Sequence, residues 1–148
     1  MTEIKTILVP VDFSAHSDKA LEYAIGLAKR FGSKLHVLHA YHVPVPIATP
    51  DQIAIPRDFF TSIREAAAKR LKACGDKVVA EGLKGETHLT EMLPVTAINE
   101  TAQRVGADLI VMGTRGLTGL KHVLLGSVAE RVIRTAPCPV LALKAHDD

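Results

Sequence analysis

The chain has 148 residues, of which 47% are hydrophobic and 23% are charged. These proportions are typical of a globular domain, and they exclude an intrinsically disordered chain. Lys plus Arg is 18 and Asp plus Glu is 16, which leaves a formal net charge of +2. So small an excess excludes a design dominated by nucleic-acid binding, because such proteins concentrate positive charge. The length predicts a single domain over residues 1–148.

The cysteine content and the length of the apolar runs indicate the cellular compartment in which the protein is expected. Two cysteines, Cys74 and Cys138, exclude a disulfide scaffold and fit a reducing compartment. Residues 1–11 lack the basic region, long apolar stretch and cleavage site of a secretory signal. No apolar run approaches the roughly 18–20 residues that a membrane-spanning helix needs. We therefore expect a soluble, cytoplasmic protein whose partners include neither a membrane nor nucleic acid.

The first third of the chain predicts a strand, a helix and a second strand. Residues 4–11 (IKTILVPV) form a short apolar, β-branched run. A helix is expected after Ser14, a good N-cap, because apolar residues then recur every three or four positions until Gly32. Residues 35–41 (LHVLHAY) predict the second strand, whose apolar character suits burial between two helical layers. This order is typical of a parallel sheet with crossover helices.

The middle of the chain holds a long loop and then a helix. Residues 42–56 contain four prolines and no helical period. Loops of this length usually line a binding site or are mobile. A second helix is expected from Phe60 to Val78 on its apolar stripe, with Gly82 as its stop. The proline-rich loop is therefore expected to join the second strand to the second helix.

The last third predicts three strands and two helices. Residues 86–92 interleave polar and apolar side chains, which suits an edge strand, whereas 108–113 and 139–143 are apolar. Helical spacing is seen over 95–105, ending at Gly106, and over 128–133. The alternation predicts an α/β protein with one doubly wound, five-stranded parallel sheet.

Residues 111–131 (VMGTRGLTGLKHVLLGSVAER) carry the most informative pattern. Gly113 closes an apolar strand, Gly116 follows it, and Gly126 with Ser127 opens a helix. Glycines at a strand end let backbone N–H groups approach a ligand, because no Cβ intervenes. A helix N-terminus adds unpaired N–H donors and partial positive charge, which together bind phosphate. The pattern is neither a Walker A loop nor a dinucleotide fingerprint, and the alternative is that these glycines only form turns.

Asp12 stands at the carboxyl end of the first predicted strand, directly after Pro10 and Val11. Ligands of open α/β sheets bind beyond the carboxyl ends of the strands, where the winding reverses. If the first and fourth strands are neighbours, Asp12 and Gly113 face one crevice. A carboxylate there can accept hydrogen bonds from ribose hydroxyls. The alternative is that Asp12 caps the helix that follows, and the two roles can coexist.

Three histidines and the two cysteines are weaker candidates. His36 and His39 belong to the second predicted strand, and His42 follows that strand at the start of the proline-rich loop. Strand alternation sends His36 and His39 to opposite faces, so they are not expected to share a metal ion. Cys74 lies on an apolar helix stripe and Cys138 has no partner motif, so neither is interpreted as a nucleophile.

The sequence resembles the universal stress protein (UspA-like) family over almost its whole length. The resemblance rests on ILVPVDFSAHSDKALEYA and on GADLIVMGTRGLTGLKHVLLGSVAERVIRTAPCPVLALK. In that family G-2x-G-9x-G-[S/T] marks the members that bind ATP, and Gly113, Gly116, Gly126 and Ser127 match it without a gap. The resemblance implies a Rossmann-like sheet of strand order 3-2-1-4-5 with helices on both faces. It also implies bound ATP, with ADP and AMP as alternatives, and Mg²⁺ or Mn²⁺ held on the phosphates.

The resemblance assigns nucleotide-binding roles residue by residue. Asp12 would contact ribose, Pro10 and Val11 would shape the adenine end, and Ala40 would present backbone atoms to adenine. Ribose and phosphates would be lined by Met112, Gly113, Arg115 and Gly116, and the phosphates would be held at a helix start by Gly126, Ser127, Val128 and Ala129. Ala129 has no side-chain donor, so its role would be limited to its backbone. No protein ligand for the metal is identified.

The resemblance further implies a homodimer formed through the last strand, Val140–Leu143, together with a protein partner that the sequence does not identify. The leading expectation is an ATP-binding regulatory protein of the stress response. One alternative is a slow ATPase or nucleotidyl transferase, although no general base with a supporting residue is evident. Another is an interaction module without nucleotide, in which loop 42–56 fills the crevice. No catalytic residue is assigned.

Overall fold

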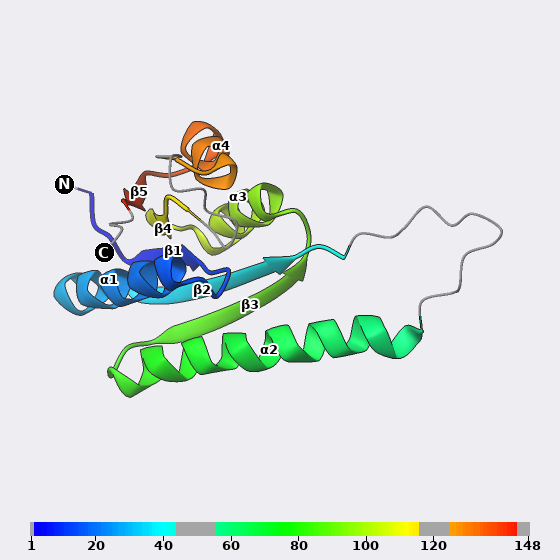
Figure 1. Ribbon diagram of the computed structural model, residues 1–148. Helices are drawn as coiled ribbons and strands as arrows, with labels where there is room; N and C mark the ends of the chain where they lie inside the picture. The colour runs from blue at the N-terminus through cyan, green and yellow to red at the C-terminus, as the bar shows by residue number, and fades with distance from the viewer. Residues whose placement is uncertain (1, 44–55, 116–124, 145–148) are drawn as a thin grey trace.

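The computed structural model describes residues 2–43, 56–115 and 125–144, which form a five-stranded parallel sheet flanked by four helices (Figure 1). The sheet order is β3-β2-β1-β4-β5, so the predicted fold class and strand order are confirmed. Adjacent strands β1 and β4 mark the point where the winding reverses. In chain order the elements are β1 (Thr6–Pro10), α1 (Ala15–Phe31), β2 (Lys34–Tyr41), α2 (Arg57–Ala80), β3 (Gly85–Glu91), α3 (Pro94–Val105), β4 (Leu109–Gly113), α4 (Ser127–Thr135) and β5 (Val140–Leu143).

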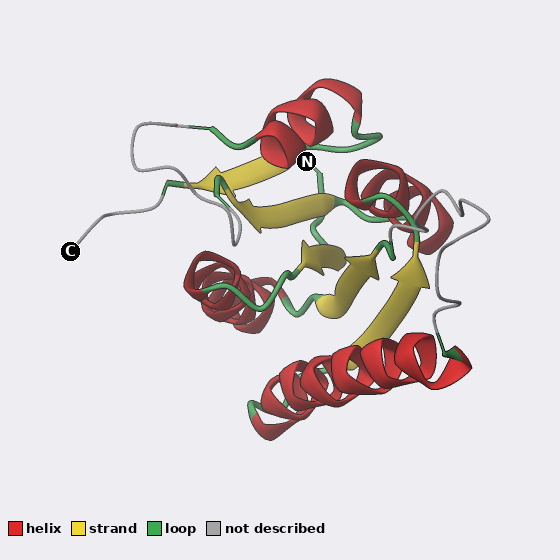
Figure 2. Ribbon diagram, turned by 45° about the vertical axis from the view of Figure 1, so that its right-hand side comes forward, coloured by secondary structure: helices red, strands yellow, loops and turns green. Residues whose placement is uncertain are grey.

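The helices cover both faces of the sheet, as Figures 1 and 2 show: α1 and α2 lie on one side and α3 and α4 on the other. Alternation along β1 divides its apolar side chains between the two layers. Ile7 and Val9 join a cluster with residues of α1 and α2, whereas Leu8 joins a cluster with residues of α3 and α4. Each of these three side chains is fully buried. Burial on both faces explains the nearly continuous apolar runs in β1, β2 and β4.

Caps fix the ends of the helices. The Ser14 hydroxyl accepts a hydrogen bond from the Ser17 amide at 3.2 Å, which confirms Ser14 as the N-cap of α1. Gly32 and Gly106 end α1 and α3 with φ angles of 69° and 65°, in the left-handed region that favours glycine. The α2 helix begins at Arg57, three residues before the predicted start at Phe60, because Arg57, Asp58 and Phe59 are all exposed and do not extend the apolar stripe.

The two edge strands differ in composition. Strand β3 is mostly exposed or half-buried, which confirms that residues 86–92 form a polar edge. Strand β5 has only four residues, all apolar and all half-buried. Most of the predicted proline-rich loop 42–56 lies outside the described residues. Within the part of the chain that the structure describes, no helix combines the length and hydropathy needed to cross a membrane.

Candidate functional site

A cavity of about 320 Å³ opens at the carboxyl ends of β1, β2 and β4, between α1 and the start of α4. Its volume lies within the range of small-molecule pockets. The strand reversal between β1 and β4 positions it, because the helices that follow these two strands leave on opposite faces. The cavity brings together all but one of the predicted site residues: Pro10, Val11, Asp12, Ala40, Met112, Gly113, Arg115, Gly126, Ser127, Val128 and Ala129. The remaining one, Gly116, lies outside the described residues.

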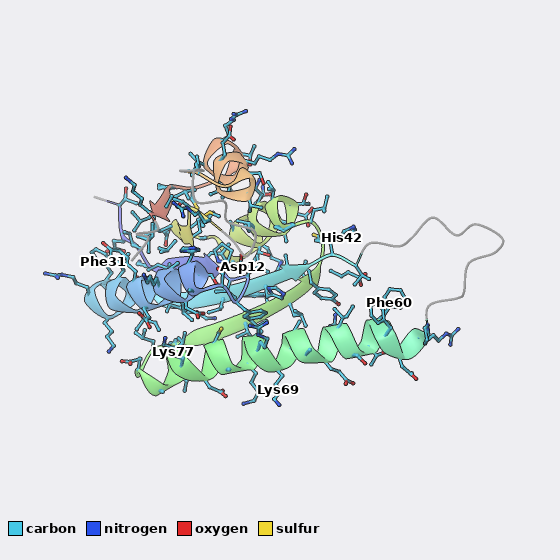
Figure 3. All side chains as sticks on the ribbon, viewed as in Figure 1. Asp12, Phe31, His42, Phe60, Lys69 and Lys77 are labelled. Atoms are coloured by element: carbon cyan, nitrogen blue, oxygen red, sulfur yellow. The ribbon has the colours of Figure 1, made fainter. Side chains whose placement is uncertain are left out.

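Asp12 lies where β1 passes into α1, near the middle of the molecule in Figure 3. Its Oδ1 accepts hydrogen bonds from the backbone amide of Ser14, at 3.0 Å, and from the Ser14 hydroxyl. The Asp12 amide in turn donates to the Ser17 hydroxyl at 3.3 Å. The carboxylate therefore stabilises the start of α1 and also lines the cavity, so both roles considered for Asp12 are compatible with its position.

The start of α4 faces the cavity without a side-chain cap. Its N-cap is Gly126, which supplies no side-chain acceptor, and the first intrahelical bond runs from the Glu130 amide to the Gly126 carbonyl. The amides of Ser127, Val128 and Ala129 therefore have no partner within the helix. All three residues line the cavity. Three amides at the positive end of the helix dipole form a favourable environment for an anion.

The position of Gly126 leaves no room for a side chain, because the backbone of the preceding segment lies against it. A Cβ at this position would lie 2.9 Å from the Thr114 carbonyl oxygen. The same oxygen accepts a hydrogen bond from the Gly126 amide at 2.6 Å, which holds the start of α4 against the end of β4. At Gly113 a Cβ would lie 3.3 Å from both the Cβ and the carbonyl oxygen of His16. The glycine pattern thus lets the β4–α4 connection approach its neighbours closely, in addition to the ligand access expected from the sequence.

Sequence reasoning missed five residues that line the cavity: Ser17, Leu38, Pro94, Ile98 and Thr114. Thr114 is the most informative of them. It is 6% exposed, and its hydroxyl has no hydrogen-bond partner among the residues that the structure describes. Its position between the predicted residues Gly113 and Arg115 was the available signal. A buried hydroxyl of this kind is a candidate donor to a ligand.

Ala40 contributes backbone groups to the cavity. Alternate residues of β2 bond to opposite neighbours: the Leu38 carbonyl accepts from the Val11 amide at 2.8 Å, and the Tyr41 carbonyl accepts from the Met92 amide at 3.1 Å. Ala40, two residues after Leu38, therefore turns its amide and carbonyl towards the β1 side. Strand β1 has already ended there, at Pro10. A donor and an acceptor consequently face the cavity side by side.

Side chains from β2 and α2 pack against the turn that follows Asp12. Phe13 has a φ angle of 64°, which is unusual for a residue with a bulky side chain. Its ring packs on His39 with the ring centroids 4.3 Å apart, and the Arg70 guanidinium lies 4.6 Å from the Phe13 centroid. His39 Nδ1 lies 2.8 Å from the Val11 carbonyl oxygen. These contacts from β2 and α2 hold the strained turn in place.

The two cysteines show no sign of activation. Cys74 and Cys138 are free and half-buried, and each packs against one of the two core clusters. Burial raises the pKa of both thiols above the ordinary value, and nearby carboxylates raise it further. A raised pKa disfavours the thiolate, which is the nucleophilic form. The interpretation of both as structural residues agrees with these positions.

Known proteins resemble the chain over nearly its full length. The model of the universal stress protein family matches residues 3–144. A universal stress protein of Methanocaldococcus jannaschii is 37% identical over 142 residues, which are 95% of this chain and 82% of that protein.

Solved structures agree with this match. The hypothetical protein MJ0577 superposes with a TM-score of 0.84 at 25% identity, covering 99% of this chain and 100% of that one. A universal stress protein in complex with cAMP gives a TM-score of 0.72 at 27% identity, covering 96% and 98%. The Archaeoglobus fulgidus protein in complex with dAMP gives 0.65 at 27%, covering 95% and 98%. The family match along nearly the whole sequence shows that this chain belongs to the universal stress protein family.

Proposed function

We propose that this universal stress protein binds ATP in the cavity between β1 and β4, with ADP and AMP as alternatives, and acts as a regulatory protein. The observation that carries the proposal is the start of α4, which has no side-chain cap and whose first residues, Ser127, Val128 and Ala129, line the cavity. Two similar structures are described as complexes with adenine nucleotides, cAMP and dAMP. Binding of a related ligand at the matching place in this chain is the simplest use of such a cavity.

The cavity has an apolar end and a polar end, which suits the two ends of a nucleotide. Adenine would lie against Pro10 and Val11 and form hydrogen bonds with the amide and carbonyl of Ala40. Ribose would lie near Asp12, whose Oδ1 accepts hydrogen bonds from Ser14 and which lines the cavity. The phosphates would lie at the start of α4, where the Thr114 hydroxyl supplies a further donor.

We further propose that a divalent cation, Mg²⁺ or Mn²⁺, accompanies the nucleotide through its phosphates. Among the described residues that line the cavity, Asp12 is the one carboxylate. Hard cations such as Mg²⁺ usually keep several waters and bind through one or two carboxylates together with substrate phosphates. The donor set therefore fits a cation held mainly by phosphate oxygens, with Asp12 as the one carboxylate among the described residues that line the cavity.

The test is calorimetric titration of nucleotide-free protein with Mg-ATP, ADP and AMP, comparing wild type with Ala40→Leu. Ala40 is half-buried and lines the cavity, so a larger side chain there occupies ligand space. We expect ATP affinity to fall by about tenfold to a hundredfold, the usual cost of overpacking. Ala68→Leu, on the exposed face of α2, is the matched control and should bind like wild type.

Equal ATP affinity in folded Ala40→Leu and wild type would overturn the assignment of the cavity. Absence of ATP binding to wild-type protein would overturn the proposed function itself. Mass spectrometry of the small molecules released on denaturation would identify a nucleotide that copurifies. Following the bound ATP over time separates a regulator, which keeps it intact, from a weak hydrolase.

We also propose a cytoplasmic homodimer that forms through β5. The free thiols of Cys74 and Cys138 suit a reducing compartment. Strand β5 is an apolar edge, and the Pro139 and Leu143 carbonyls accept from Ile110 and Thr114 of the β4 side. Alternation then turns the amide of Ala142 away from β4, towards the open edge.

The dimer is tested with Ala142→Pro, which removes an outward donor while sparing the hydrogen bonds to β4. We expect sedimentation to show a dimer for wild type and a monomer for the variant. A dimer of unchanged stability in the variant would exclude this edge as the interface. A monomeric wild-type protein would exclude the dimer altogether.

A further inference from the structure

A second cluster of ligand-type side chains lies on the neighbouring strands β2 and β3, away from the carboxyl ends that form the cavity. It consists of His36 on β2 and of Glu86 and His88 on β3, and their ligand atoms all lie within 4.8 Å of one another. We call it the His–Glu cluster. It belongs to no part of the nucleotide site described above, since none of its members lines that cavity.

The sheet register brings the three side chains together. His36 is directly opposite Glu86, and Leu38 is directly opposite His88, in a parallel pair. Opposite residues of paired strands share a face, so all three cluster side chains project towards the α3 side. The backbone hydrogen bonds of seven paired residues in β2 and β3 fix this arrangement before any ligand arrives. Rigid elements of this kind hold a first coordination shell well.

The distances between the ligand atoms of the cluster are close to those found around a tetrahedral metal ion. His36 Nδ1 lies 2.8 Å from His88 Nε2, and 3.9 Å from Glu86 Oε2. Ligand atoms on a tetrahedral Zn²⁺ at about 2.0–2.1 Å are roughly 3.3 Å apart, between these two values. The two rings are nearly parallel, with an interplanar angle of 21°. Small rotations of the rings and of the Glu86 side chain would therefore open room for the ion.

The protonation states also suit a cation. Burial is the main cause that lowers the pKa of both His36 and His88, so the rings are neutral near pH 7. The hydrogen bond from Lys34 is the main cause that lowers the pKa of Glu86, so its carboxylate is ionised. Neutral imidazoles and a carboxylate are the forms that bind metal. Each ring can keep its proton on the nitrogen that faces away from the ion, so binding to the neutral pair releases no proton.

Solvent access and nearby charges determine how tightly the His–Glu cluster is expected to bind a cation. His36 is 6% exposed, whereas Glu86 is exposed and His88 half-buried, so the cluster opens to solvent at the β3 edge. Lys34 Nζ lies 2.9 Å from Glu86 Oε2 and competes for the carboxylate. Arg104, at the end of α3, adds a second positive charge that acts on both histidines. Both cations are expected to weaken binding of a further cation at the cluster.

We propose that His36, Glu86 and His88 form a Zn²⁺ site that ties the edge strand β3 to β2. Two imidazoles, one carboxylate and an open position for water are a common zinc ligand set. The ion would replace the hydrogen bond between the two rings and draw Glu86 away from Lys34. This inference is independent of nucleotide binding, because it rests on another set of side chains.

The experiment is a titration of nucleotide-free, tag-free protein with Zn²⁺ against a chromophoric chelator. We expect wild type to bind one equivalent of Zn²⁺. His88→Gln and Glu86→Gln should each weaken binding at least about tenfold, because loss of a residue that only supports a metal ligand already costs about that much. His42→Gln is the matched control, since His42 is exposed and lies at the far end of β2 in Figure 3. Glu86→Gln changes an exposed side chain and should fold even if His88→Gln does not.

Two further readouts separate a built site from scattered surface binding. Co²⁺ bound to wild type should give the intense visible spectrum of tetrahedral coordination, and this spectrum should be lost in His88→Gln. Zinc about a hundredfold above its Kd should raise the Tm of wild type by about 5–10 °C. No binding to wild type, or equal binding by wild type, Glu86→Gln and His88→Gln, would overturn the proposal.

Discussion

The cavity lies at the carboxyl ends of the strands and the His–Glu cluster lies on the α3 side of β2 and β3, and the two are built in different ways. The cavity uses backbone groups and small residues, such as the amides at the start of α4 and the β2 backbone at Ala40. The His–Glu cluster uses three large polar side chains from two paired strands. A site made from backbone depends on close approach of chain segments, whereas a site made from side chains depends on register. The two should therefore respond to different kinds of substitution.

The largest effect is expected where a side chain would obstruct the backbone. Gly126→Ala would add a Cβ 2.9 Å from the Thr114 carbonyl oxygen, so α4 must shift away from β4. We expect the free energy of unfolding to fall by about 1–3 kcal/mol and nucleotide affinity to fall at least about tenfold. Chemical denaturation and calorimetry measure the two effects, and zinc binding should stay unchanged.

Gly26→Ala is the matched control for this substitution. Gly26 lies inside α1, and a Cβ there would meet nothing within 4 Å. Replacing an exposed helical glycine by alanine should stabilise the protein by about 0.5–1 kcal/mol and leave both sites intact. If Gly126→Ala behaves like Gly26→Ala, then close approach of the backbone does not form the cavity.

The same contrast explains how much could be predicted from sequence. Glycine spacing, strand ends and helix starts are local signals, and they indicated Asp12, Gly113, Gly126 and Ser127, whereas most of the other predicted cavity residues came from the resemblance to the family. Ser14 and Gly32 likewise marked the ends of α1 correctly, because caps depend on neighbouring residues. Leu38 and Ile98 were missed because their side chains meet only after β2 and α3 pack together.

The His–Glu cluster was missed for a non-local reason. Strand alternation was expected to send His36 and His39 to opposite faces. In the structure His39 contacts Phe13 and the Val11 carbonyl, whereas His36 contacts His88. His88 comes 52 residues later and joins His36 only through the register of β2 and β3. The order 3-2-1-4-5 makes these strands neighbours, but it leaves their offset open. A one-residue slip would send His88 to the other face.

An intermediate effect is expected at Asp12, which combines a structural and a proposed binding role. Asp12→Asn keeps an oxygen that can accept from the Ser14 amide but loses the charge. We expect stability within about 0.5 kcal/mol of wild type and a nucleotide affinity lower by about fivefold to tenfold, since hydrogen bonds to a charged acceptor are stronger. Ser14→Ala, which removes the N-cap, should show the reverse: about 1 kcal/mol of lost stability and unchanged affinity.

Denaturation curves and titrations of both variants separate the two roles. Should Asp12→Asn bind nucleotide as well as wild type does, Asp12 serves only the start of α1. Should Ser14→Ala weaken nucleotide binding as strongly as Asp12→Asn, the two residues act as one unit through their hydrogen bonds. Either result would mean that Asp12 has no role in nucleotide binding that can be separated from its structural role at the start of α1.

The smallest effect, and the sharpest test of the side-chain site, is expected at Lys34. Its ion pair with Glu86 is largely exposed, with exposed side-chain fractions of 43% and 51%, so it adds little stability. Lys34→Met would release Glu86 and remove a positive charge beside the proposed ion. We expect Zn²⁺ to bind about threefold to tenfold more tightly, with the free energy of unfolding changed by less than about 1 kcal/mol.

Lys29→Met provides the control, because Lys29, on α1, forms a similarly exposed ion pair with Glu81 at the end of α2, and these two helices cover the face of the sheet opposite the His–Glu cluster. It removes the same charge from the protein as a whole, so any difference between the two variants reflects position rather than net charge. Competition titration with a chelator measures both affinities. Equal affinities for Zn²⁺ in Lys34→Met and Lys29→Met would mean that Glu86 is not a ligand. A selective gain in zinc affinity in Lys34→Met would show that the ion pair between Lys34 on β2 and Glu86 on β3 competes with zinc for the Glu86 carboxylate.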